Sequence, residues 1–136
     1  MTRPMRHATL LLVLLTCTAL ATTMSPPAAA AAAPKLQVFF ASDFADREYQ
    51  KKAYAKVASL WVMPAEMPPE GNKAVVIVVI LRDGKGAEVR LHMESGSQAW
   101  DDAAVAAVKE SIPFPALPAE YGRDSVEVHF HFMFTE

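Results

Sequence analysis

The chain has 136 residues, a formal net charge of -2 and 52% hydrophobic residues. This length fits one domain, and a charge so close to neutral does not supply the basic surface that nucleic-acid binding needs, so we expect no nucleic-acid partner. Cys17 is the only cysteine, which excludes a framework of disulfides within the chain.

The segment Met1–Ala33 has the features of an export signal followed by a low-complexity Ala/Pro stretch. Arg3 and Arg6 form a basic start, and Leu10–Leu15 forms a short apolar centre. Ala19-Leu20-Ala21 then offers a small-x-small cleavage site. The segment therefore predicts a protein exported to the periplasm, with residues 34–136 as its domain.

Cleavage is expected near Ala21 or within Ala28–Ala33. The apolar run Ala8–Ala21 has 14 residues, whereas a membrane-spanning helix needs ~20. An uncleaved anchor, which would hold the domain on the periplasmic side of the inner membrane, remains the alternative. Only in that case do we expect contact with the membrane.

The segment Asp43–Trp61 predicts a first helix. Ser42 or Asp43 is the expected cap, because both side chains can accept a hydrogen bond from a free backbone N–H of the first turn. The expected apolar face consists of Tyr49, Ala53, Val57, Leu60 and Trp61.

Three segments predict strands. Ala74–Leu81 is apolar throughout, which favours a central strand, and Asp83-Gly84 after it is typical of a hairpin turn. Ala87–Met93 and Val126–Phe134 alternate apolar and polar residues, which indicates one buried and one solvated face for each.

A second helix is predicted over Ser97–Ser111, with Ser97 as its cap and Pro113 just after its end. Its apolar positions repeat with helical spacing and are mostly small, so the helix can lie close to a sheet. They are Trp100, Ala103, Ala104, Ala107, Val108 and Ser111.

These elements predict an α+β fold of two layers in the order αββαβ. Three antiparallel strands form the sheet, and both helices pack on one of its faces. A right-handed crossover through the second helix places Val126–Phe134 at one edge of the sheet.

The second helix and its flanks resemble the signature of TonB and TolA C-terminal domains. The residues that carry the resemblance are Ser95, Gly96, Trp100, Asp101, Ala103, Ala104, Ala107, Val108, Pro113, Phe114 and Pro115. It extends over roughly Asp46–Phe134 and implies a non-enzymatic periplasmic domain that binds other proteins of the bacterial envelope. Outer-membrane receptors and periplasmic proteins are the expected partners, and a homodimer remains open.

No arrangement of residues indicates catalysis or a cofactor. Asp101 and Asp102 are adjacent helical positions that face different ways, so we interpret them as complements of the helix dipole. His129 and His131 share a strand face about 6.5 to 7 Å apart, and they are the candidates for an alternative function as a small periplasmic metal- or ligand-binding protein. A metal site would need a third ligand.

The last strand is the candidate partner-binding surface. In the families that the chain resembles, partners add a strand to this edge or dock beside it. The candidate contact residues are Val126, Glu127, Val128, His129, Phe130, His131 and Phe132. The alternative is that the chain covers this edge itself, with Leu36, Val38, Phe39 and Phe40 adding as a strand.

The resemblance also implies a second class of function, an inner-membrane-anchored energy transducer for outer-membrane transport. Such a transducer has a histidine within its anchor and a long Pro-rich spacer. Here His7 precedes the apolar run, and Thr22–Ser42 has 21 residues, which reach at most about 70 Å. We therefore expect a free-standing domain, with a short anchored transducer as the alternative.

Overall fold

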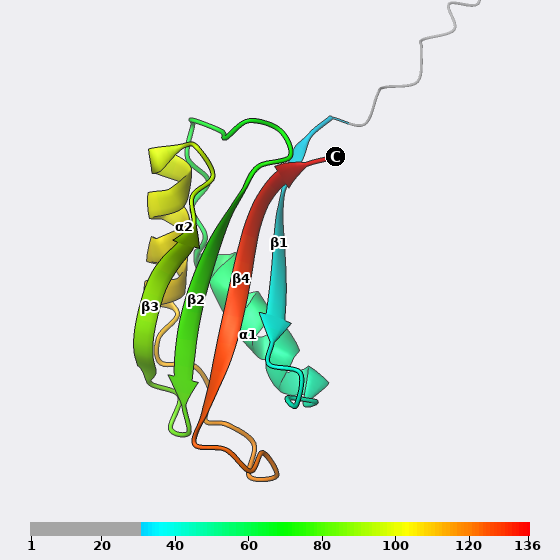
Figure 1. Cartoon of the computed structure of the whole chain (residues 1–136), viewed down its shortest axis with the longest axis vertical. Coiled ribbons are helices and arrows are strands. Elements are labelled where there is room, and N and C mark those ends of the chain that lie inside the picture. Colours follow the sequence, from blue (N-terminus) through cyan, green and yellow to red (C-terminus); the bar gives the residue numbers. More distant parts are fainter. Residues whose placement is uncertain (1–30) are drawn as a thin grey trace, which may run out of the picture.

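A computed structural model describes residues 31–136 of the chain. Its elements are β1 (Ala33–Phe40), α1 (Arg47–Leu60), β2 (Lys73–Leu81), β3 (Gly86–Met93), α2 (Gln98–Glu110) and β4 (Ser125–Thr135). The four strands form one antiparallel sheet in the order β1-β4-β2-β3. Both helices lie on the same face of this sheet (Figure 1).

The α+β class and the two layers are confirmed, but the sheet has four strands where the sequence predicted three. The additional strand is β1, which pairs with β4 from Ala33 opposite Thr135 to Phe40 opposite Val128. The prediction that β4 lies at an open edge is therefore wrong. The alternative, in which the segment around Leu36–Phe40 covers that edge, is what the structure shows.

The predicted export signal lies outside the described residues, except for residues 31–33. β1 begins within those three residues, at Ala33. Within residues 31–136, neither helix is long and apolar enough to cross a membrane.

The first helix begins later than predicted, at Arg47, and its cap is Asp46 instead of Ser42 or Asp43. The Asp46 carboxylate accepts a hydrogen bond from the Tyr49 N–H at 2.9 Å. The chain before it folds into a turn because Phe44 is an apolar residue that enters the core, where it is 4% exposed. The cap is an aspartate, a residue type that commonly caps helices, but it lies three residues after Asp43. The burial of Phe44 explains why the helix begins at the later aspartate.

The core lies between the sheet and the two helices. The inward side chains of β4 and of β2 form its floor, and those of β2 are Ala74, Val76, Val78 and Ile80. Trp61 closes it at the end of α1, where its ring meets the Trp100 and Phe132 rings edge-on at centroid distances of 5.2 and 4.9 Å. Trp61 is partly buried and packs against the core, as its place on the expected apolar face of the first helix predicted.

The small face of α2 packs against β2 and β3. Ala104 is fully buried and Ala107 is 1% exposed, as the helical spacing predicted. Ser97 caps the helix as predicted. Asp101 differs from its interpretation as a dipole complement alone, because it is buried and accepts a hydrogen bond from the Ser95 N–H at 2.9 Å.

The close packing of α2 gives a direct test. Ala104→Leu and Ala107→Leu should each lower the free energy of unfolding by about 1 to 3 kcal/mol, because a buried alanine against a sheet leaves no room for three more carbons. Lys109→Ala, on the exposed side of the same helix, should be nearly neutral. Denaturant midpoints of the three variants check this, and equal midpoints would contradict the packing.

Candidate functional site

The seven candidate contact residues fall on the two faces of β4. Val126, Val128, Phe130 and Phe132 point into the core and are at most 1% exposed. Their side chains cannot meet a partner without unfolding the domain. What these four positions can offer to a partner is backbone N–H and C=O groups.

The other three candidates, Glu127, His129 and His131, lie on the face of the sheet away from the helices. The Glu127 carboxylate lies 2.6 Å from Nε2 of His129, and this hydrogen bond is the main reason why the pKa of Glu127 is lowered. His131 Nδ1 lies 3.5 Å from the Lys73 ammonium. These polar groups therefore pair with their neighbours on the sheet.

A third imidazole reaches this face from β3. The His92 and His129 ring centroids are 6.4 Å apart, although β2 runs between their strands. The two side chains therefore approach each other across β2. Within residues 31–136, however, no three His, Cys, Asp or Glu side chains are grouped closely enough to hold a metal ion.

The outer backbone edge of β4 is paired with β1 along eight residue pairs. The side chains of β1 contribute less to the core than those of β2 and β4, because Leu36 is its only buried residue. Val38 and Phe40 are partly buried, and Phe39 is 49% exposed with its ring centroid 4.6 Å from that of His131. Full burial of one leucine contributes about 1.5 to 3 kcal/mol. β1 is thus held mainly by its backbone hydrogen bonds.

The opposite edge of the sheet, formed by β3, is better protected against strand addition. Its pairing with β2 shifts register at two places, between Val75 and Val76 and between Val79 and Ile80. Glu88 and Arg90 add an exposed ion pair at 3.5 Å. Irregular pairing and charged side chains are the usual means by which an edge avoids further pairing. The β1 side is therefore the better candidate for binding an extended segment.

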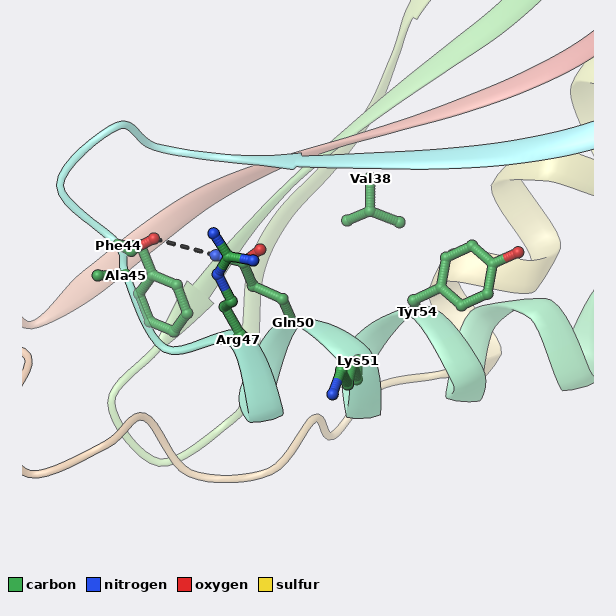
Figure 2. A pocket seen from close by; sticks show the side chains of 7 residues that line it. All are labelled: Val38, Phe44, Ala45, Arg47, Gln50, Lys51 and Tyr54. Atoms are coloured by element: carbon green, nitrogen blue, oxygen red, sulfur yellow. Dashed lines mark hydrogen bonds between the residues drawn. The ribbon is translucent and has the colours of Figure 1, made fainter.

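A groove of about 590 Å³ lies between β1 and α1. Figure 2 shows Val38 pointing into it from β1, with the side chains of Arg47 and Gln50 turned toward that strand from the helix. Its lining residues are Val38, Phe44, Ala45, Arg47, Gln50, Lys51 and Tyr54.

Sequence reasoning missed this groove, although the sequence holds a signal for it. Arg47, Gln50, Lys51 and Tyr54 recur at i, i+3, i+4 and i+7, which defines a second face of α1 beside the apolar one. A helix face lines a groove only where another element covers it, and β1 was not among the three predicted strands.

Together, the two layers and the four-stranded sheet with β1 at its edge define a small α+β domain. Comparison with protein-family models matches residues 46–132 to the TonB C terminal family. The match spans more than half of the chain, and the chain belongs to this family. No curated protein and no solved structure matched the chain. Domains of the family are non-enzymatic, face the periplasm and generally bind outer-membrane receptors.

The environment of His131 predicts a dependence of stability on pH. Desolvation, followed by the charges of Lys73, His129 and His92, lowers the pKa of His131 from its ordinary value of 6.5. The unfolded chain therefore binds this proton more readily than the folded chain. Stability from this residue is complete above pH 6.5 and is lost as the pH falls through that value toward the folded pKa.

His131→Gln should accordingly reduce the loss of stability between about pH 7 and about pH 5. Urea midpoints of the wild type and the variant at both pH values measure this difference. The same loss in both proteins would show that His131 does not contribute to it.

Proposed function

We propose that the chain is an exported interaction module that binds an extended segment of an envelope protein along β4, at Val126–Phe132, in the place that β1 occupies. The observation that carries this proposal is the weak side-chain anchorage of β1, with one buried residue in an eight-residue strand. A partner strand would recover the backbone hydrogen bonds that β1 gives up. The side-chain packing that the exchange costs is that of Leu36 and of the partly buried Val38 and Phe40, which a partner strand can replace with its own side chains.

The alternating faces of β4 also support the proposal. Its inward side chains stay in the core during an exchange, so β4 and α2 keep their packing with β2, and α1 keeps its packing with α2. The partner then meets a preformed edge. We propose an outer-membrane receptor as the partner, because the family generally binds such receptors.

A disulfide trap can test whether β4 accepts a strand from another molecule. Gln37 lies opposite His131, so a peptide with the sequence of Pro34–Ala41 and Cys in place of Gln37 should cross-link to a His131→Cys variant of the full chain. The variant also carries Cys17→Ser, so that one thiol remains. β1 competes at an effective concentration of about 1 mM, so we expect trapping at millimolar peptide.

The matched control is Arg90→Cys in the same background, which places the thiol on β3. A peptide with the same composition in scrambled order controls for thiol reactivity. More cross-linking at position 131 than at position 90, with the ordered peptide alone, supports exchange at β4. Equal cross-linking at both positions would contradict it.

The state of the N-terminus distinguishes this proposal from an anchored energy transducer. We expect the signal to be cleaved, which leaves a periplasmic protein that begins between Thr22 and Lys35. Intact mass after cell fractionation measures this. Recovery of the full-length chain in the inner-membrane fraction would instead favour the transducer.

A further inference from the structure

A partner strand must bind β4 more favourably than β1 does, because β1 is tethered to the domain and always present near the edge. Both strands make the same backbone hydrogen bonds with β4, so any advantage has to come from side chains. The inward positions of β1 are Leu36, Val38 and Phe40. Each of them shows what a competing strand meets at that point.

Two of these positions call for apolar side chains. Leu36 is 9% exposed and belongs to the core. The Phe40 ring stacks on Phe44 at a centroid distance of 4.9 Å and meets Tyr49 edge-on at 6.1 Å. A partner strand can match these contacts but gains nothing over β1 there.

The position of Val38 is different, because its short side chain faces the groove of about 590 Å³ and leaves it open. A valine reaches only two bonds beyond the backbone, whereas a longer side chain at the same position would extend between β1 and α1 (Figure 2). Among Leu36, Val38 and Phe40, this is the position where a competing strand can add contacts that β1 does not make.

The lining of the groove specifies the chemistry of such a side chain. Arg47 makes no ion pair within residues 31–136, while Lys51 is paired with Glu48 at 3.0 Å. Gln50 donates one amide hydrogen to the Phe44 carbonyl at 3.0 Å. No acidic residue lines the groove. Its polar part is therefore positive, and its walls carry the rings of Phe44 and Tyr54.

We infer that the partner strand carries a glutamate at the position of Val38, opposite Phe130, between an aliphatic residue two positions before and an aromatic residue two positions after. The glutamate methylenes pack against the groove walls, and the carboxylate meets the Arg47 guanidinium, which binds carboxylates with two parallel N–H groups. The inference rests on the proposed exchange at β4. It adds which extended segments the module selects.

Three peptides test the inference in the same disulfide trap, with the sequence of Pro34–Ala41, Cys at the position of Gln37, and Val, Gln or Glu at the position of Val38. Cross-linking of each peptide to the His131→Cys chain is divided by its cross-linking to the Arg90→Cys chain. The Glu peptide should bind about two- to tenfold more tightly than the Gln peptide, and added salt should reduce the difference.

Arg47→Glu should abolish or reverse this preference. The matched control is Lys52→Glu, the same change of charge on the same helix at an exposed residue that does not line the groove. If all three peptides are trapped at position 131 with equal strength, exchange at β4 stands and the glutamate preference is overturned.

The stability of variants of the full chain tests the carboxylate preference of the groove without any peptide. Trapping of none of the peptides at position 131 would overturn the proposed function. In the full chain, Val38→Glu should still have a higher denaturant midpoint than Val38→Gln, and Arg47→Glu should invert this order. The same order in both backgrounds would show that the groove does not select a carboxylate.

Discussion

Pairing of the β4 backbone on both sides is the interaction on which the rest of this domain depends. On one side β4 pairs with β2, from Lys73 opposite Met133 to Leu81 opposite Ser125, and this pairing builds the floor of the core. On the other side it pairs with β1, which buries a single residue, Leu36. Both pairings are antiparallel backbone ladders, but β2 buries many more side chains than β1 does. The side chains of β1 therefore oppose local opening less than those of β2 and β4 do.

Apolar side chains are buried on both faces of the sheet, but different groups cover them on each face. On the inner face, the helices cover β2 and β4. On the outer face no helix is present among residues 31–136, yet Val75 and Ile77 are 3% and 2% exposed. The long side chains of the neighbouring strands, including the imidazoles of His92 and His129, lean over β2 and cover these residues. The apolar residues of β2 on the outer face are therefore buried within the domain itself.

Much of the fold followed from patterns within single elements. The alternation from Val126 to Phe134 identified the buried side of β4, the apolar run Ala74–Leu81 identified the central strand, and Ser97 was the correct cap of α2. These predictions held because each depends on burial within one element. β1 was harder, because Leu36–Phe40 follows a low-complexity stretch and only becomes a strand when β4 offers an unpaired edge.

The groove could not be predicted for the same reason. Arg47 and Tyr54 are surface residues of an isolated helix, and they line a groove only once β1 lies above α1. Likewise, Asp101 looked like a dipole complement because its hydrogen bond to the Ser95 N–H depends on how the chain turns before α2. In each case the missing information was a contact between segments, whereas sequence periodicity reports on one segment at a time.

When the chain's own strand covers an edge, a partner must bind that edge with enough affinity to displace the strand. An open edge accepts any extended segment, because main-chain pairing carries no information about sequence. With β1 in place, a segment enters only if its side chains outweigh an intramolecular competitor present at an effective concentration of about 1 mM. Every side-chain contact that a partner makes and β1 does not then counts directly toward selection. In the proposed exchange, a side chain that enters the open groove at Val38 would make such a contact, and the domain would then select a narrow set of partners.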